Sequence, residues 1–218
     1  MKVLVIGSGG REHALVWKLS QSKRVTRIYA APGNPGMKEL AEIVDIKPTD
    51  IIDLADFAKE ECINLAVVGP EQPLALGIVD EFNSQNLRIF GPNQKAALIE
   101  SSKSFAKEFM KKNNIPTSDF SVFNSALDAI AHLDKAAYPL VVKADGLAGG
   151  KGVYICRNKE EGEESVREIM LEGKFGKSGE KVIIEEFLSG QEMSFVVISD
   201  GRRVVPLATV TRAPKVFP

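Results

Sequence analysis

The sequence has few cysteines and few histidines. Cys62 and Cys156 are its two cysteines among 218 residues. Two thiols so far apart in sequence indicate neither a disulfide framework nor a CxxC metal site, so we expect both to be reduced. The two histidines, His13 and His132, have no cysteine or obvious acidic partner near them in sequence. This argues against a zinc site and against a catalytic triad.

Net charge and long apolar runs are also missing. The 28 basic and 29 acidic residues give a net charge of −1, so no overall attraction to nucleic acid or to an anionic membrane is expected. The first apolar run, Val3–Ile6, is shorter than the core of a signal peptide, which has about 7 to 15 residues. No run approaches the roughly 18 apolar residues that span a bilayer. We therefore expect a cytoplasmic, monomeric protein with small-molecule ligands and with neither nucleic acid nor membrane as a partner.

What is present is the composition of a folded α/β protein. Hydrophobic residues make up 44% and charged residues 26% of the chain, which excludes a disordered or fibrous protein. Through about residue 100, short apolar runs alternate with amphipathic stretches, as in βαβ units with an open parallel sheet. The expected strands are Lys2–Ile6, Thr26–Ala30, Glu42–Ile46, Leu65–Val68 and Leu87–Phe90, and the expected helices are Glu12–Ser20, Ile51–Glu60 and Leu74–Phe82.

Beyond Gly91-Pro92-Asn93 the pattern changes to that of a smaller α+β unit. Helices are expected over Lys95–Ile99, Lys103–Asn113, Ala126–Lys135 and Glu160–Leu171, and strands over Ser121–Phe123, Leu140–Lys143, Val153–Cys156 and Val182–Glu186. Two further alternating runs, Met193–Ile198 and Arg203–Leu207, are joined through Asp200-Gly201. That turn favours positive φ and therefore predicts a β-hairpin.

The first motif is Gly7-Ser8-Gly9-Gly10-Arg11-Glu12-His13, directly after a strand and at the start of a helix. Backbone N–H groups at such a turn bind anions such as phosphate. The dinucleotide pattern GxGxxG requires glycine where Glu12 stands, and the second strand ends in Tyr29-Ala30-Ala31-Pro32-Gly33 without an acid for a ribose. Both departures argue against a nicotinamide or flavin cofactor. A phosphate site is favoured here over a purely structural turn.

The second motif is Gly69-Pro70-Glu71-Gln72-Pro73, at the carboxyl end of the fourth expected strand. Open α/β sheets bind their ligands at this edge. Glu71 is therefore a candidate acceptor for a substrate hydroxyl or amine. The alternative is a solvent-exposed acid that the helix dipole favours near a helix N-terminus, and the motif alone does not decide between the two.

The third motif, Lys143 to Val153, is the most informative. An apolar strand ends in Lys143, a loop with four glycines carries Lys151, and another strand follows. This predicts a flexible hairpin flap whose two cations clamp a polyphosphate. A P-loop, GxxxxGK[ST], would need glycine at Asp145 and serine or threonine at Gly152. A surface hairpin with incidental lysines is disfavoured because the loop is so rich in glycine.

The fourth motif is the apolar strand Val182–Ile184, which runs into two acids and then Phe187. Such a segment is able to line a purine slot, with backbone groups reading the adenine edge and Glu192 reaching the ribose hydroxyls. The alternative is a strand end with solvated carboxylates. From this segment alone, the alternative is favoured.

Taken together, these motifs resemble the phosphoribosylamine–glycine ligase (glycinamide ribonucleotide synthetase) family of ATP-grasp enzymes in purine biosynthesis. The motifs that carry the resemblance, in order, are Val5 to His13, Ala31 to Asn34, Gly69 to Leu74, Phe90 to Pro92, Lys103 to Lys107 and Lys143 to Val153. The resemblance covers residues 1–209 and about the first half of that family's chain. It implies an N-terminal α/β substrate-binding domain over 1–100, an ATP-grasp lobe with its flap over 101–188, and the first strands of the next lobe, incomplete, over 189–218.

The resemblance implies a carbon–nitrogen ligase that joins 5-phosphoribosylamine to glycine through a glycyl phosphate, with ATP cleaved to ADP and phosphate and with Mg²⁺ or Mn²⁺ as cofactor. Lys143 and Lys151 would be catalytic. Carried over residue by residue, the resemblance implies that the ATP phosphates would contact Lys103, Lys143 and Lys151. The adenine would lie along Glu185, Phe187 and Leu188, and its ribose would be bound by Glu192. Phosphoribosylamine would face Gly9, Gly10 and Glu71.

Two departures limit this expectation. The family's metal ligands lie in the half of its chain without a counterpart here, so none is expected in this sequence. After Ala208-Thr209 the residues Val210–Pro218 do not follow the family's polar, glycine-rich continuation. We therefore expect a truncated chain that lacks full ligase activity. A non-catalytic nucleotide-binding module and another ATP-grasp carboxylate–amine ligase stay open, whereas a dinucleotide-dependent oxidoreductase is disfavoured by Glu12.

Overall fold

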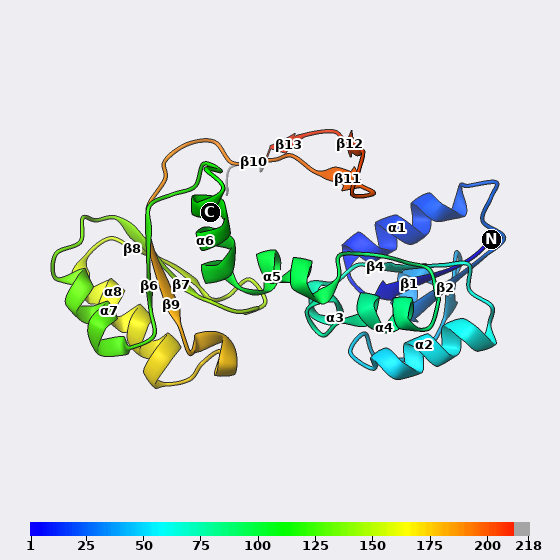
Figure 1. Cartoon of the computed structure of the whole chain (residues 1–218), viewed down its shortest axis with the longest axis horizontal. Coiled ribbons are helices and arrows are strands. Elements are labelled where there is room, and N and C mark those ends of the chain that lie inside the picture. The colour runs from blue at the N-terminus through cyan, green and yellow to red at the C-terminus, as the bar shows by residue number, and fades with distance from the viewer. Residues whose placement is uncertain (212–218) are drawn as a thin grey trace.

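A computed structural model describes residues 1–211, and residues 212–218, most of the divergent tail, lie outside the described residues. The described chain forms two lobes that are joined through helix α5 (Gln94–Ser101), as Figure 1 shows. The first lobe contains a parallel sheet and the second an antiparallel one. The predicted α/β class, with a parallel-sheet domain followed by an α+β lobe, is confirmed.

The first lobe is built on a five-stranded parallel sheet. Its strands are β1 (Lys2–Gly7), β2 (Arg27–Pro32), β3 (Glu42–Ile43), β4 (Leu65–Val68) and β5 (Ile89–Phe90), and their order is β3-β2-β1-β4-β5. The chain moves outward from β1 to β3 and then crosses to the other side of β1, so the strand order reverses between β1 and β4. Open parallel sheets bind ligands at the carboxyl ends of the strands beside such a reversal.

Successive side chains of β1 point to opposite faces of the sheet, so this lobe has a hydrophobic core on each face. Helix α1 (Gly10–Ser20) covers one face, where Val16 packs with Val5 and its neighbours. Helices α2 (Ile51–Glu60) and α4 (Ile78–Ser84) cover the other face, where Phe82 packs with Leu4 (Figure 1). Burying each such side chain contributes about 1.5–3 kcal/mol, and the two filled faces leave the carboxyl edge of the sheet for a ligand.

The second lobe is built on a four-stranded antiparallel sheet in the order β6-β9-β7-β8. The strands are β6 (Phe120–Phe123), β7 (Leu140–Ala144), β8 (Val153–Cys156) and β9 (Val182–Glu186). Helices α7 (Ala126–Leu133) and α8 (Lys159–Val166) cover one face, where Val142 and Ile184 are buried. Because side chains alternate along a strand, Lys143 and Glu185 lie on the opposite face.

Some predicted elements differ from the structure. The helix predicted over Leu74–Phe82 is two helices, α3 (Glu71–Ala75) and α4, because Gly77 between them adopts a φ of +90°. The predicted helix Glu160–Leu171 ends as α8 at Val166 and continues as a π-helical segment, Arg167–Leu171. Two predicted strands of the parallel sheet are shorter than expected, since β3 and β5 have two residues each.

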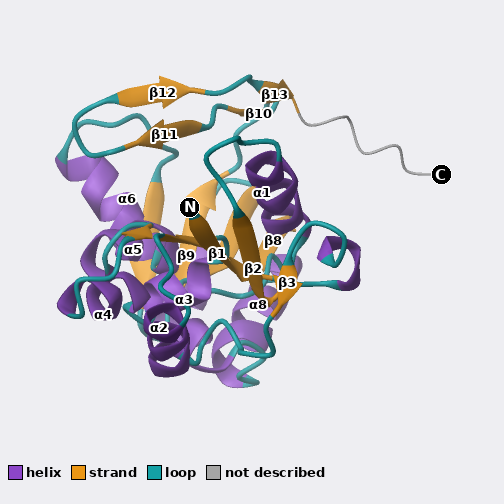
Figure 2. Ribbon diagram, turned by 90° about the vertical axis from the view of Figure 1, so that its right-hand side faces the viewer, coloured by secondary structure: helices purple, strands orange, loops and turns teal. Residues whose placement is uncertain are grey.

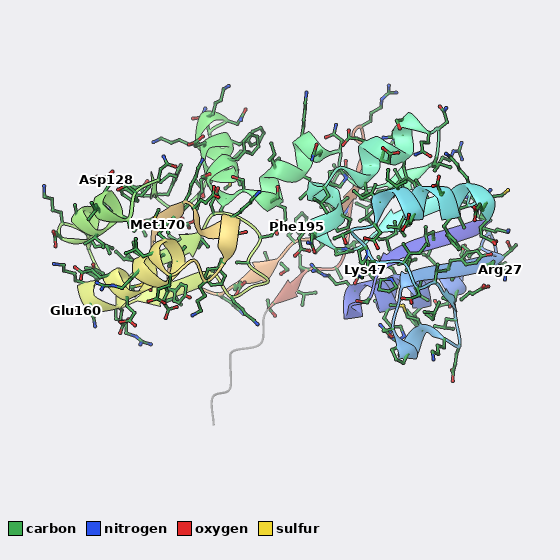
Figure 3. All side chains as sticks on the ribbon, turned by 90° about the horizontal axis from the view of Figure 1, so that it is seen from below. Arg27, Lys47, Asp128, Glu160, Met170 and Phe195 are labelled. Carbon is green, nitrogen blue, oxygen red and sulfur yellow. The ribbon has the colours of Figure 1, made fainter. Side chains whose placement is uncertain are left out.

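The segment after β9 forms two small antiparallel sheets between the lobes. Strands β11 (Val197–Ser199) and β12 (Val204–Pro206) pair around Asp200-Gly201, which confirms the predicted hairpin. The first run is divided, however, because β10 (Met193–Ser194) pairs with β13 (Val210–Thr211) instead. Figure 2 shows the two small sheets above the other elements, and Figure 3 places Phe195 of this segment between the lobes. The predicted division between residues 188 and 189 stays a prediction.

Candidate functional site

A cavity of about 310 Å³ opens on the face of the second sheet that α7 and α8 leave uncovered. Residues of α3, α5, helix α6 (Lys103–Lys112), the loop after β7, and strands β7 and β9 line it. Three ammonium groups, those of Lys103, Lys107 and Lys143, lie along this lining. Apolar side chains of Ile99 and Met110 add to its wall. A cavity that combines cations with apolar surface suits a ligand with a polyanionic end and a flat apolar end.

Asp145 brings two of these lysines together. Its carboxylate accepts hydrogen bonds from the backbone N–H of Ser104 at 2.7 Å and from the hydroxyl of Ser102 at 3.2 Å. Its carbonyl oxygen accepts one from the backbone N–H of Lys103 at 3.0 Å. Since Ser102 also caps α6, the start of that helix is tied to the end of β7. Lys103 and Lys143, which come from different elements, therefore line the same cavity.

Lys103 is a half-buried cation directed at the backbone of the flap. Its ammonium donates a hydrogen bond to the carbonyl oxygen of Gly146 at 2.8 Å. Burial lowers the pKa of Lys103, the carboxylate of Asp145 offsets part of that effect, and the charge of Lys143 lowers the pKa further. A bound anion would favour the charged form of Lys103, so this pKa is expected to rise when a polyphosphate enters.

Glu185 lies between two ammonium groups, one buried (Lys107) and one partly exposed (Lys143). Its Oε2 atom is 2.9 Å from Nζ of Lys143 and 3.0 Å from Nζ of Lys107, and it accepts a hydrogen bond from the hydroxyl of Ser118 at 2.9 Å. The residue is 5% exposed. Burial alone would raise the pKa of Glu185, but the hydrogen bonds from Lys143, Lys107 and Ser118 outweigh it, so the pKa is lowered. Glu185 is therefore a carboxylate at neutral pH.

The other carboxylate oxygen of Glu185 has a different environment. Oε1 is buried and has no hydrogen-bond partner among the residues that the structure describes. A buried acceptor without a donor is costly, by about 1–3 kcal/mol. Because Glu185 lines the cavity, a ligand with a hydrogen-bond donor is able to satisfy it.

The loop between β7 and β8 is fixed at its base and ends in a turn that the backbone N–H of Lys151 closes by donating to the carbonyl oxygen of Ala148 at 3.1 Å. At the base, Ser178 donates a hydrogen bond from its hydroxyl to the carbonyl oxygen of Leu147 at 2.8 Å. At the tip, Gly149 and Gly150 have φ values of +58° and +75°, and an added Cβ would meet no atom within 4 Å at either position. Lys151 follows and is exposed. The arrangement is that of a hinged flap with open space around its tip.

The glycine turn after β1 is occupied by Glu12. The Glu12 carboxylate accepts a hydrogen bond from the backbone N–H of Gly9 at 2.6 Å, and the residue is 4% exposed. It fits there because Gly7 and Gly69 have no side chains, as a Cβ on Gly69 would lie 2.2 Å from its Oε1. Glu12 therefore joins the ends of β1 and β4, and one N–H of the turn is already bound.

Glu71 lies at the first lobe's side of the cavity. It begins α3 directly after β4, and its carboxylate is 3.6 Å from a guanidinium nitrogen of Arg11. Arg11 follows the glycine turn on α1. Glu71 thus lines the cavity at the point where the strand order of the parallel sheet reverses.

The cavity brings four of the predicted residues together, namely Lys103, Lys143, Glu185 and Glu71. Six others do not belong to its lining, namely Gly9, Gly10, Lys151, Phe187, Leu188 and Glu192, and their roles stay predictions. Lys107, Ala106 and Met110 also line the cavity, and no role was predicted for them from the sequence. Together with Lys103 they repeat at the spacing of one helical face, and this period is the signal that would have found them.

Residues 1–211 contain neither a cluster of metal-binding side chains nor a helix suited to a membrane. Within that range no group of three or more histidine, cysteine, aspartate or glutamate side chains is arranged to hold a metal ion. The carboxylate nearest the cavity cations, Glu185, is committed to Lys107 and Lys143. The residues described therefore do not form a metal centre of their own. In the same range, no helix is both long and apolar enough to cross a membrane.

Two family descriptions match this sequence. Residues 1–100 match "Phosphoribosylglycinamide synthetase, N domain", and residues 101–217 match "Phosphoribosylglycinamide synthetase, ATP-grasp (A) domain". The second match passes Thr209, where the sequence led us to expect the resemblance to end. Among curated relatives, a phosphoribosylamine–glycine ligase from Clostridium acetobutylicum is 47% identical over 100% of this chain and 52% of its own length. One from Escherichia coli is 48% identical over 96% of this chain and 49% of its own.

Two solved structures superpose on this chain, one of them a ligase with the same name as the curated relatives. A phosphoribosylamine–glycine ligase from Thermotoga maritima superposes with a TM-score of 0.75 at 30% identity, covering 96% of this chain and 49% of its own. An N5-carboxyaminoimidazole synthase from Aspergillus clavatus, in complex with ADP and 5-aminoimidazole ribonucleotide, superposes with a TM-score of 0.75 at 18% identity, covering 98% and 54%. The second likeness shows the fold alone. The chain spans about half the length of the curated relatives it matches.

Proposed function

We propose, since this chain belongs to the phosphoribosylglycinamide synthetase family, that it supplies the ATP site of a phosphoribosylamine–glycine ligase. The reaction would join 5-phosphoribosylamine to glycine with cleavage of ATP to ADP and phosphate. ATP would phosphorylate the glycine carboxylate, and the amine of phosphoribosylamine would then displace phosphate from the resulting glycyl phosphate. The observation that carries the proposal is the cavity where Lys103 and Lys143 lie beneath a glycine flap.

The lysines and the flap have complementary roles in this chemistry. Phosphoryl transfer depends on positioning and on stabilising charge more than on covalent catalysis. Lys103 and Lys143 would bind the phosphate oxygens, and Lys151 would reach them when the flap closes. A closed flap would also exclude water from the glycyl phosphate. Mg²⁺ or Mn²⁺ is the proposed cofactor, and no described residue is assigned as its ligand.

The unpaired oxygen of Glu185 orients the proposed nucleotide. The exocyclic amine of adenine is a donor of the kind that Glu185 Oε1 lacks. The guanine ring has a carbonyl oxygen at the same position, which would face a buried carboxylate. Phe187 and Leu188 follow β9 directly, and we assign them to the side of the adenine ring, with Glu192 assigned to the ribose. The pocket would therefore prefer ATP to GTP.

The phosphoribosylamine site would lie at the carboxyl edge of the parallel sheet. Gly9 and Gly10 form the start of α1 there, and Glu71 begins α3 beside them. The carboxylate of Glu71 faces the guanidinium of Arg11 at 3.6 Å, on the helix that follows the glycine turn. In this position Glu71 would accept a hydrogen bond from the amine or a ribose hydroxyl of the substrate.

Calorimetric titration with ATP and with GTP tests this function. We expect ATP to bind at least about fivefold more tightly than GTP, because replacing a hydrogen bond by an unpaired buried acceptor costs about 1–3 kcal/mol. The chain is titrated in the presence and the absence of Mg²⁺ so that the contribution of the metal is seen separately. Equal affinity for the two nucleotides would refute the assignment of Glu185, and no binding of either would refute the ATP site.

Limited proteolysis tests the flap. Trypsin is expected to cleave after Lys151, because the residue is exposed and follows two glycines with no atoms around their Cβ positions. Saturating ATP should slow this cleavage by about fivefold or more, since closure removes the locally open states that proteases attack. Cleavage after Lys23, an exposed residue in the turn after α1, is the internal control and should be unchanged. Equal cleavage at Lys151 with and without ATP would mean that the flap does not close over the nucleotide.

A further inference from the structure

Lys107 lines the cavity, yet its ammonium is fully engaged by the protein. The side chain is 9% exposed. It donates a hydrogen bond to the hydroxyl of Thr117 at 2.8 Å and another to the hydroxyl of Ser118, and it pairs with Glu185 at 3.0 Å. A lysine ammonium has three N–H donors. Together with the carbonyl oxygen of Ser118, which lies 3.3 Å from the ammonium, these acceptors outnumber the three donors, so Lys107 has no donor left for a ligand.

Lys143 differs from Lys107 in this respect. Its side chain is 26% exposed, and its ammonium donates a hydrogen bond to Glu185 at 2.9 Å. Lys107 and Lys143 therefore share the same carboxylate oxygen, Glu185 Oε2. Two ammonium groups and one carboxylate leave one positive charge in excess. Because Lys107 is saturated by its own neighbours, that excess charge is available at Lys143.

We propose that Lys107 is a positioning residue: it holds Glu185 so that Lys143 keeps its charge for the phosphates of ATP. This inference rests on the proposed ATP site. Without Lys107, Glu185 would pair with Lys143 alone, and the pair would present no net charge to a polyphosphate. Lys107 would thus act on the nucleotide through Glu185, with no contact of its own.

The simpler alternative is that Lys107 only stabilises the fold as a counter-charge for Glu185. The two roles differ in what they predict for ligand binding. A fold-stabilising residue affects the fraction of folded chain and leaves the affinity of the folded chain for ATP unchanged. A positioning residue weakens the binding of ATP but not of adenosine, since adenosine has no phosphates and Glu185 keeps Lys143 and Ser118 as partners beside the adenine.

The first experiment compares Lys107→Met with Lys111→Met by calorimetry. Lys111 is the matched control because it lies one turn further along α6 and also approaches the ring of Phe120, at 5.8 Å against 5.6 Å for Lys107. We expect Lys107→Met to raise the Kd for ATP by about tenfold, the range of one charge-assisted hydrogen bond, and to leave the Kd for adenosine within about twofold. Lys111→Met should change neither. Unchanged ATP affinity in a folded Lys107→Met variant would overturn the proposal.

The second experiment stays informative if Lys107→Met fails to fold. The double variant Lys107→Met/Glu185→Gln is compared with Glu185→Gln, so that the carboxylate is absent from both. If Lys107 acts only through Glu185, the two variants bind ATP with Kd values within about twofold, as expected for residues coupled through a shared partner. If the double variant bound ATP tenfold more weakly than Glu185→Gln, the proposal would be overturned, because Lys107 would then act on ATP without Glu185. Failure of the ATP site itself is recognised separately, since the unaltered chain would then bind no ATP.

Discussion

Replacing Lys143 with methionine is expected to raise the Kd for ATP about 100-fold, near the upper range for a hydrogen bond between charged groups. Lys143 is the more exposed of the two ammonium groups that share Glu185. Methionine keeps most of the length and the apolar stem of lysine, so the change removes mainly the charge. The proposed pocket would then keep Lys103, and Lys151 of the closed flap, for the phosphates.

The same substitution should leave the chain folded. Glu185 keeps Lys107 at 3.0 Å and the hydroxyl of Ser118 at 2.9 Å, so no buried carboxylate is left without a partner. The control is Lys135→Met, an exposed lysine that follows α7 on the other side of the second sheet. Isothermal titration of both variants with ATP measures the effect. An affinity for ATP equal to that of Lys135→Met would remove Lys143 from the phosphate site.

Replacing Gly69 with alanine is expected to lower the free energy of unfolding by about 2–4 kcal/mol, the combined range for overpacking and for loss of a buried hydrogen bond. The new Cβ would lie 2.2 Å from Oε1 and 2.3 Å from Cγ of Glu12. The Glu12 side chain would have to leave the position where it accepts the N–H of Gly9. A carboxylate that is 4% exposed would then lose its partner or open the turn.

Gly10→Ala is the matched control for this prediction. A Cβ at Gly10 would meet no atom within 4 Å, and the residue begins α1. Alanine there is expected to raise the free energy of unfolding by up to about 1 kcal/mol, since glycine is the poorer helix former. Urea denaturation of both variants gives the comparison. If Gly69→Ala proved as stable as Gly10→Ala, the packing of Glu12 against Gly69 would not matter to the fold.

The parallel sheet was predictable because its signals are local. Runs such as Leu65–Val68 coincide with the observed strand, and alternating strand and helix patterns specify a parallel arrangement. The break between α3 and α4 was missed because the apolar spacing continues across Gly77, whose positive φ depends on its neighbours. Periodicity therefore identified the layers better than the ends of the helices.

The candidate site was predictable only in part, for a different reason. Lys143 and the flap are adjacent in sequence, and their pattern of lysine and glycine points to phosphate. The pairing of Lys107 with Glu185 joins α6 to β9, far apart in the chain, and nothing in either segment indicates the other. Glu12 was interpreted as a departure from a dinucleotide pattern. Its contact with Gly69 gives it a role of its own, as a buried link between β1 and β4.

The carboxylate of Asp145 has a consequence for the energetics of nucleotide binding. It joins the first turn of α6 to the end of β7 through Ser102 and Ser104, so the backbones that carry Lys103 and Lys143 are held together before any ligand arrives. A ligand that meets a preorganised pair of cations loses less of its affinity to ordering the protein. The conformational entropy that remains to be lost on binding is then concentrated in the tip of the flap, where no atom lies within 4 Å of a Cβ position at Gly149 or Gly150.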